Sequence, residues 1–260
     1  MAAATTAGGT AATSRYVALG DSYASGTGLK DQQDSQCARS LRSYPALLAG
    51  AYKSSFKTAT CTGATTASIR NRQGGKPPQA DSLSADTTLV TLTIGGNDIG
   101  FSEIIATCVS RAANDRNGNP CQRHYGDQLR QRIDKLSPRI GTVLKDIKQR
   151  SPRAQVVLVG YPSLLPGDGS SCAWESVPFA KRDIPYLDHT VFQLNEMLRQ
   201  QAAWTGAIYV DTYTPTRGKD MCRPADKRYI EPVMPLGAQS AHPNGMGHLI
   251  MSVLVKQRIG

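Results

Sequence analysis

Near its start the chain reads Tyr16-Val17-Ala18-Leu19-Gly20-Asp21-Ser22, a short apolar run that ends at a glycine and is followed by polar residues. A continuous apolar run of this length is typical of a strand buried on both faces, as in a parallel sheet. In open parallel sheets, functional groups lie on the loops that follow the carboxyl ends of the strands. The pattern therefore predicts a central strand and makes the residues just after it candidates for a functional site.

Further segments with the composition of strands alternate along the chain with helical segments. The predicted strands also cover residues 56–60, 88–94, 155–159 and 207–210, and the predicted helices cover residues 43–53, 101–111, 129–147, 183–204 and 244–256. Such alternation indicates a parallel sheet with helices on both faces. We therefore expect an α/β fold, a three-layer αβα sandwich on a five-stranded, mostly parallel sheet. A single domain over residues 15–260 would follow a flexible segment, residues 1–14.

Length and charge limit the classes of protein that fit. The chain has 260 residues, 40% of them hydrophobic, and its net charge is +10. This composition fits a soluble globular protein and excludes a disordered chain, and no apolar run is long enough for a transmembrane helix. The basic residues are dispersed, and acidic residues interrupt their densest group, residues 111–139. We therefore expect a solvated basic surface and no nucleic-acid partner. The alternative is a salt-sensitive attraction to anionic lipid, cell-wall polymer or nucleic acid.

Six cysteines are spread along the chain, and none has the spacing of a zinc site. Many disulfide pairings are open to them. The simplest joins neighbours, Cys37–Cys61, Cys108–Cys121 and Cys172–Cys222, because each bond would close a loop between successive elements. Disulfides favour an extracellular protein, and the alternative is a cytosolic protein with six reduced thiols. The opening segment has neither the basic nor the apolar region of a signal peptide, so we expect a mature secreted form.

Residues suited to acyl transfer follow the predicted strands. Ser22 follows the first strand, Gly63 the second and Asn97 the third, and His242 precedes the last helix. A serine hydroxyl becomes a nucleophile when a base such as a histidine takes its proton. The tetrahedral intermediate then needs preorganised hydrogen-bond donors for its oxyanion. We therefore predict Ser22 as the nucleophile and His242 as the general base. The oxyanion hole would consist of the backbone N–H groups of Ser22 and Gly63 with the side-chain amide of Asn97.

Together these residues form four blocks in a fixed order. The blocks are Gly20-Asp21-Ser22, Gly63, Gly96-Asn97-Asp98 and His242-Pro243-Asn244. In this order they resemble the SGNH hydrolases, the GDSL-type lipase and esterase family, and within it a secreted actinobacterial branch of lipases, esterases and phospholipases. The resemblance implies a flavodoxin-like fold and hydrolysis of carboxylic esters of lipids without a cofactor. It also implies neighbour-paired cysteines. We further expect an extracellular monomer that touches lipid surfaces transiently.

One position departs from the family pattern. The family commonly has an aspartate three residues before the catalytic histidine, and this chain has Gln239 there. A neutral amide cannot stabilise an imidazolium as a carboxylate does. Some members of the secreted branch orient the ring through a backbone carbonyl two residues upstream, which here belongs to Ser240. The alternative is a distant carboxylate, such as Asp98 or Asp211.

The sequence leaves two other functions open. One is a deacylase of polysaccharides or plant esters, which the same family contains. The other is a non-catalytic lipid- or glycan-binding module, although such a module would not require a serine, an asparagine and a histidine together. We expect no metal and no cofactor, because the sequence has no cluster of metal ligands and Gly26-Thr27-Gly28 lacks the rest of a dinucleotide fingerprint.

Overall fold

The structure is a computed structural model that describes residues 15–52, 54–168 and 172–260. Its central sheet has five parallel strands in the order β4-β1-β5-β6-β7. The strands are β1 (Arg15–Gly20), β4 (Ser55–Thr58), β5 (Leu89–Thr93), β6 (Gln155–Val159) and β7 (Ile208–Val210). The predicted α/β class and parallel sheet are confirmed. The segment 1–14, predicted to be flexible, lies outside the described residues.

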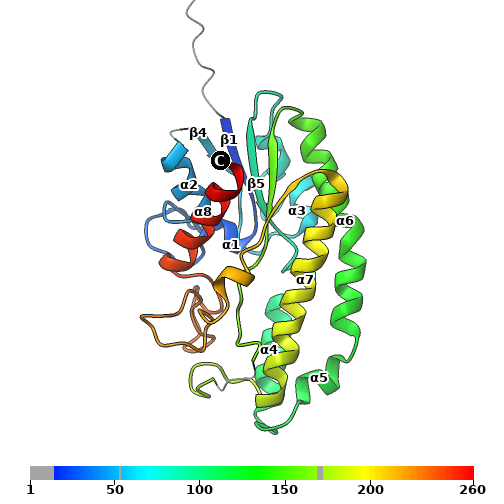
Figure 1. Cartoon of the computed structure of the whole chain (residues 1–260), viewed down its shortest axis with the longest axis vertical. Helices are drawn as coiled ribbons and strands as arrows, with labels where there is room; N and C mark the ends of the chain where they lie inside the picture. Colours follow the sequence, from blue (N-terminus) through cyan, green and yellow to red (C-terminus); the bar gives the residue numbers. More distant parts are fainter. Residues whose placement is uncertain (1–14, 53, 169–171) are drawn as a thin grey trace, which may run out of the picture.

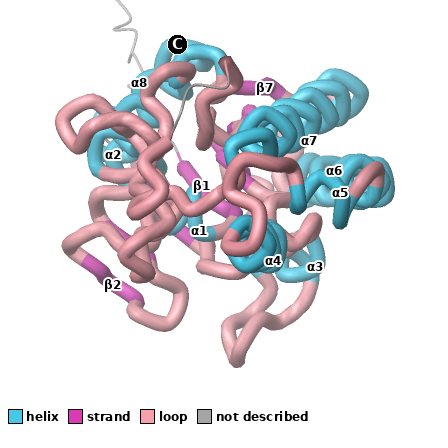
Figure 2. Tube along the Cα trace, turned by 90° about the horizontal axis from the view of Figure 1, so that it is seen from below, coloured by secondary structure: helices cyan, strands magenta, loops and turns pink. Residues whose placement is uncertain are grey.

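Helices cover both faces of this sheet. The α-helices of the described residues are α1 (Ser22–Ser25), α2 (Tyr44–Tyr52), α3 (Thr66–Arg70), α4 (Phe101–Ala112), α5 (Pro120–Tyr125), α6 (Gln128–Arg150), α7 (Ile184–Thr205) and α8 (Gly245–Ile259). Short 3-10 helices lie at Gln79–Ser82, Lys181–Asp183 and Thr214–Thr216, and β2 (Gln32–Asp34) pairs with β3 (Arg39–Ser40) in a small antiparallel hairpin. Figure 1 shows α2 and α8 on one side of the sheet and α6 and α7 on the other, and Figure 2 shows the same layers from below.

The strands bury both faces, as their apolar composition predicts. In β1, Val17 and Leu19 join the core formed with α4, α6 and α7. Tyr16 and Ala18, which alternate with them, join the second core formed with α2 and α8. Side chains of successive strand residues point to opposite faces, so one apolar run serves two cores.

The chain leaves neighbouring strands β1 and β5 toward opposite faces of the sheet. The helix α2, which comes after β1, packs against α8, whereas α4 and α6, which come after β5, belong to the other core. Such a divergence opens a crevice at the carboxyl ends of the two strands. Gly20 is required at the end of β1, because its φ is +135° and a side chain there would collide with the Thr93 carbonyl oxygen.

The short elements were not predicted from the sequence. Neither α1, α3 nor α5 is long enough to show a helical repeat of apolar residues, and the strands β2 and β3 consist of polar residues only. The turn-rich stretch before α5 leads directly into that helix, whose first residue is Pro120. Proline fits the first turn of a helix, because its missing N–H has no partner there.

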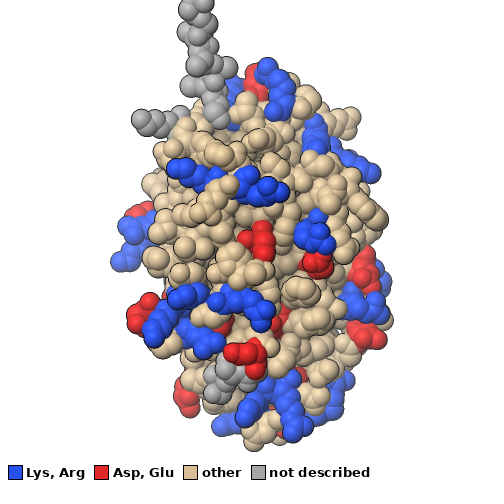
Figure 3. All heavy atoms as spheres, viewed as in Figure 1, with Lys and Arg blue, Asp and Glu red and all other residues tan. Residues whose placement is uncertain are grey.

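The six cysteines form the disulfides Cys37–Cys61, Cys108–Cys121 and Cys172–Cys222, the neighbour pairing that the sequence favoured. The alternative of reduced thiols does not hold in this structure. On the face drawn in Figure 3, Lys and Arg side chains lie in separate groups with acidic side chains beside several of them. In the part of the chain that the structure describes, no helix is long and apolar enough to cross a membrane.

Candidate active site

A cavity opens at the carboxyl ends of β1 and β5. It is lined by Asp21, Ser22, Tyr23, Gly96, Asn97, Phe101, Ser102, Ile105, Tyr161, Ser240, Ala241 and His242. Four residues predicted from the sequence, Ser22, Asn97, Ser240 and His242, therefore line one cavity, although more than 200 positions separate the first from the last. Gly63 is not among the lining residues.

Ser22 is the first residue of α1 and is buried at the tight turn that follows β1. Asp21 caps this short helix, because its Oδ1 accepts a hydrogen bond from the Tyr23 N–H at 2.9 Å. The Asp21 N–H donates to the Thr93 carbonyl oxygen at 2.9 Å, which ties the turn to the end of β5. The backbone around the serine is thus held from both sides.

The imidazole of His242 is oriented by a backbone carbonyl. Its Nδ1 lies 2.8 Å from the Ser240 carbonyl oxygen. A carbonyl oxygen only accepts hydrogen bonds, so Nδ1 carries the proton and the neutral ring keeps Nε2 as an acceptor. Burial lowers the pKa of His242 below its usual value, and the hydrogen bond to Ser240 opposes this effect. The ring is therefore neutral near pH 7, the state that a general base requires.

The two carboxylates considered as alternatives bind elsewhere. Asp98 accepts hydrogen bonds from the backbone N–H of Thr66 at 2.9 Å and from its hydroxyl at 2.5 Å. Asp211 accepts from the backbone N–H groups of Tyr213 and Thr214. Asp98 therefore supports the loop that carries Asn97, and the hydrogen bond that the His242 ring makes through Nδ1 goes to Ser240.

Asn97 connects the cavity to the loop that contains Gly63. Its Nδ2 donates a hydrogen bond to the Ala64 carbonyl oxygen at 2.9 Å, which uses one of the two amide protons. Gly63 itself is exposed, and its φ of +74° lies in the left-handed region that favours glycine. The structure thus places the Gly63 loop beside Asn97 but outside the cavity lining.

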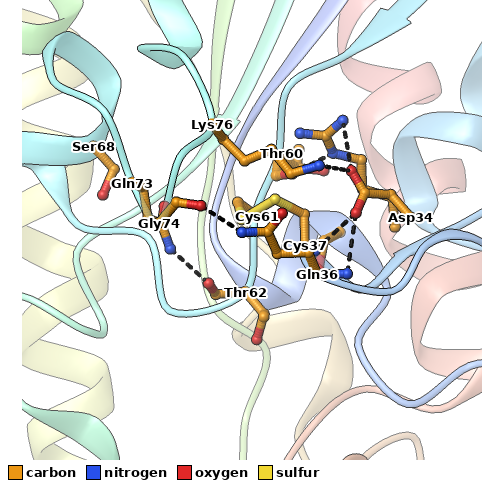
Figure 4. The surroundings of a disulfide bond; sticks show 12 residues. Asp34, Gln36, Cys37, Thr60, Cys61, Thr62, Ser68, Gln73, Gly74 and Lys76 are labelled. Atoms are coloured by element: carbon orange, nitrogen blue, oxygen red, sulfur yellow. Dashed lines mark hydrogen bonds and ion pairs between the residues drawn. A yellow bond between two sulfur atoms is a disulfide. The ribbon is translucent and has the colours of Figure 1, made fainter.

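A disulfide and a set of polar contacts hold the Gly63 loop (Figure 4). Cys61 is bonded to Cys37, and the Thr62 N–H donates to the Cys37 carbonyl oxygen at 3.0 Å. On the other side of the loop, the Gln73 side-chain amide donates to the Thr62 carbonyl oxygen at 2.8 Å. The loop is therefore fixed to two separate segments of the chain.

Two tyrosines that the sequence analysis did not single out join the blocks of the site. The Tyr23 hydroxyl donates to the Ala241 carbonyl oxygen at 2.5 Å, and its ring packs on His242 with centroids 5.2 Å apart. The Tyr161 hydroxyl donates to Asp21 Oδ2 at 2.5 Å and accepts from the Gly96 N–H at 2.8 Å. The sequence did offer a signal for Tyr161, because it follows a predicted strand as Ser22 and Asn97 do.

Asp21 is a buried carboxyl group beside the candidate nucleophile. Burial raises its pKa to about 7, and the hydrogen bonds from Tyr161 and the Tyr23 N–H partly offset this effect. Near neutral pH the Asp21 carboxyl group is therefore present in both its protonated and its ionised form.

A second, almost wholly apolar pocket adjoins the cavity. It is lined by Phe101, Ile104, Ile105, Leu164, Leu165, Phe179, Leu187, Thr190, Val191 and Met221. Phe101 and Ile105 of α4 line both spaces. The lining has the chemistry that receives a hydrocarbon group.

Comparison with known proteins relates this chain to ester hydrolases. A sequence profile of the GDSL-like lipase/acylhydrolase family matches residues 18–250. The chain is 35% identical to Lipase 2 of Streptomyces coelicolor over 245 residues, which cover 91% of this chain and 83% of that protein. It is 31% identical to a lipase of Streptomyces rimosus over 235 residues, covering 89% of this chain and 81% of the relative.

Solved structures agree with the sequence comparison. The extracellular lipase of Streptomyces rimosus superposes with a TM-score of 0.81 at 29% identity, and phospholipase A1 of Streptomyces albidoflavus superposes with a TM-score of 0.81 at 28% identity. Each comparison covers 95% of this chain and 100% of the other. An acetylxylan esterase of Geobacillus stearothermophilus, at 15% identity and a TM-score of 0.53, shares the fold.

The chain is therefore a carboxylic ester hydrolase with an α/β fold. It belongs to the GDSL-like lipase/acylhydrolase family, and within that family it is similar to the lipases of Streptomyces. The family resemblance predicted from the four sequence blocks is confirmed.

Proposed function

We propose that this hydrolase cleaves its ester through an acyl-enzyme on Ser22. The Ser22 hydroxyl oxygen attacks the ester carbonyl carbon while His242 Nε2 takes the hydroxyl proton. The tetrahedral intermediate collapses, the ester C–O bond breaks, and His242 returns the proton to the leaving alcohol. A water molecule, activated by the same imidazole, then hydrolyses the acyl-enzyme and frees the carboxylic acid.

One observation carries this proposal. Ser22 and His242 line the same cavity, and the hydrogen bond from Nδ1 to Ser240 leaves Nε2 as the basic nitrogen. Burial keeps that nitrogen unprotonated at neutral pH. The pair would therefore act as a Ser–His dyad, with a backbone carbonyl where a triad has a carboxylate.

The same proposal assigns the oxyanion hole to the Ser22 N–H, the Gly63 N–H and the Asn97 amide. The second amide proton of Asn97 supports its part, because the first is used by the Ala64 carbonyl oxygen. The role of Gly63 is supported by the hydrogen bond that ties its loop to Asn97. Removal of a single oxyanion donor lowers kcat by about 100- to 1,000-fold in a serine hydrolase.

We also propose that the acyl group belongs to a lipid. The apolar pocket next to the cavity supports this, since Phe101 and Ile105 are shared and an acyl chain could pass along them. Relatives named lipase and phospholipase A1 support the same substrate class. Three disulfides, and similarity to an extracellular lipase, support a secreted enzyme, which we expect to act as a monomer in transient contact with lipid surfaces.

The experiment is hydrolysis of p-nitrophenyl esters from acetyl to palmitoyl and of phosphatidylcholine vesicles. Ser22→Ala and His242→Ala should each lower kcat by about 10,000-fold or more. Gln239→Ala, the matched control on the histidine loop, should retain most of the activity. Turnover by Ser22→Ala at the wild-type rate would refute the nucleophile. A loss in Gln239→Ala as complete as in Ser22→Ala would refute the role of the Ser240 carbonyl.

The chain-length profile tests the substrate class. Binding in the apolar pocket predicts a maximum of kcat/KM at medium or long chains, and Val191→Trp, which fills that pocket, should shift the maximum toward acetyl. A maximum at acetyl in the wild-type enzyme, unchanged by Val191→Trp, would instead favour a deacetylase. No turnover of any ester would favour a binding module.

A further inference from the structure

We infer that Tyr161 is a positioning residue for the reaction, because its hydroxyl joins the turn that carries Ser22 to the loop that carries Asn97. This inference rests on the proposed function. Tyr161 follows β6, so it belongs to neither the serine block nor the asparagine block, yet its side chain reaches both.

The hydroxyl makes one hydrogen bond as a donor and one as an acceptor. It donates its proton to Asp21 Oδ2 at 2.5 Å and accepts the Gly96 N–H at 2.8 Å. Asp21 precedes Ser22 and Gly96 precedes Asn97, so each partner is one residue from a group that acts on the ester. Asp21 and Tyr161 are each 1% exposed, so both contacts are buried and costly to break.

The backbone of Tyr161 is itself fixed. The Asn195 side chain accepts a hydrogen bond from the Tyr161 N–H at 2.8 Å and donates to the Tyr161 carbonyl oxygen at 2.9 Å. Its ring meets the ring of Tyr23 edge-on, with centroids 5.1 Å apart. The hydroxyl is therefore held at a defined point between the two loops, as a positioning group must be.

Loss of the hydroxyl would leave two buried polar groups without this partner, the Gly96 N–H and one oxygen of Asp21. The two loops would then relax independently, and Ser22 and the Asn97 amide would no longer be held in a fixed position relative to one another. A misplacement of about 1 Å at a reacting centre lowers the rate by about 100-fold. The effect should appear mainly in kcat, because Tyr161 lines the catalytic cavity and is not among the lining residues of the apolar pocket proposed for the acyl chain.

Tyr161→Phe tests the inference, with Tyr16→Phe as the matched control. Tyr16 is also 1% exposed, and its hydroxyl shares a hydrogen bond with Thr91 at 2.7 Å, but it does not line the cavity. With the best p-nitrophenyl ester, Tyr161→Phe should lower kcat by about 10- to 100-fold with KM within about two-fold. The rate of Ser22 labelling by a fluorophosphonate should fall in parallel, whereas Tyr16→Phe should change kcat by less than about two-fold.

Gly96→Ala provides a second variant that keeps the hydroxyl. A Cβ at Gly96 would lie 3.1 Å from the Tyr161 hydroxyl oxygen, so it crowds the same contact. It should also lower kcat, and the double variant with Tyr161→Phe should lose less than the product of the two single losses, because both act through one contact. Equal kcat values for Tyr161→Phe and Tyr16→Phe, or fully multiplicative losses, would overturn the inference. An active Ser22→Ala variant would show instead that the proposed function itself is wrong.

Discussion

The two sides of the candidate active site are held by different kinds of interaction. On the inner side, the hydroxyls of the buried residues Tyr23 and Tyr161 bind the histidine loop and the Ser22 turn. On the outer side, the Cys37–Cys61 disulfide holds the Gly63 loop. Partly exposed ion pairs of Asp34 with Arg39 and Lys76 lie in the segments that carry Cys37 and Gln73. The inner side should therefore respond to pH through its buried carboxyl group. The outer side should respond to reductant and, weakly, to salt.

The largest effect is expected on the outer side, from loss of the Cys37–Cys61 disulfide. In a Cys37→Ala/Cys61→Ala variant, the free energy of unfolding should fall by about 2–5 kcal/mol. The Gly63 loop would keep only its hydrogen bonds, so kcat should fall by about 10-fold or more at temperatures where the protein is folded. Urea unfolding and ester kinetics measure the two effects.

The matched control for this variant is Cys108→Ala/Cys121→Ala, which removes a disulfide between α4 and α5. It should lower stability to a similar extent without lowering kcat in the folded protein. Equal kcat losses in both double variants would show that the Cys37–Cys61 bond has no special relation to the site.

On the inner side, Asp21 should make stability depend on pH. Its pKa is raised from 3.8 to about 7 in the folded protein. Between these values the folded state binds a proton that the unfolded state has lost, so the free energy of unfolding falls as pH rises through this window. Asp21→Asn removes this pH dependence, which amounts to about 4 kcal/mol over the whole window.

Urea unfolding of wild type and Asp21→Asn at pH 4.5, 5.5, 6.5 and 7.5 measures the difference. The free energy of unfolding of wild type minus that of Asp21→Asn should fall as pH rises and become constant above about pH 7.5. Titration of other groups is common to both proteins and cancels. Parallel stability curves would mean that Asp21 stays ionised when buried.

The smallest effect is expected from the ion pair between Lys76 and Asp34, whose charged atoms lie 2.8 Å apart. Both side chains are partly exposed, so Lys76→Ala should lower stability by less than about 1 kcal/mol. The loss should shrink further in about 1 M salt, where exposed charges are screened. Thermal melts at low and high salt check this, and a loss that grows with salt would contradict it.

That Ser22, Asn97 and His242 lie together could be predicted from the sequence, because each block is local. Ser22 and Asn97 come shortly after strands that have clear apolar runs. A serine and an asparagine at such positions indicate which chemistry to expect. The contacts between blocks could not be predicted in the same way. Tyr161 meets Asp21 across 140 residues, and Tyr23 meets Ala241 across 218 residues. Pairings of this kind depend on the packed fold, which no local pattern encodes.

For the fold, too, local patterns could be predicted from the sequence and features that depend on distant contacts could not. Strands with strong apolar runs were predicted within one or two residues, as for β5 and β6. The short helix α3, which supplies the backbone N–H that binds Asp98, was not predicted. Its five residues carry no helical period, and it is stabilised by a capping box at Thr65 and by the tertiary contact.

The opposite departures of the chain from β1 and β5 have a consequence for how such enzymes diversify. The crevice between these strands arises from connectivity, so it exists whatever side chains surround it. Loops around the rim can be exchanged to alter substrate preference while the two apolar cores beneath keep their composition. A scaffold of this type separates the evolution of selectivity from the maintenance of folding.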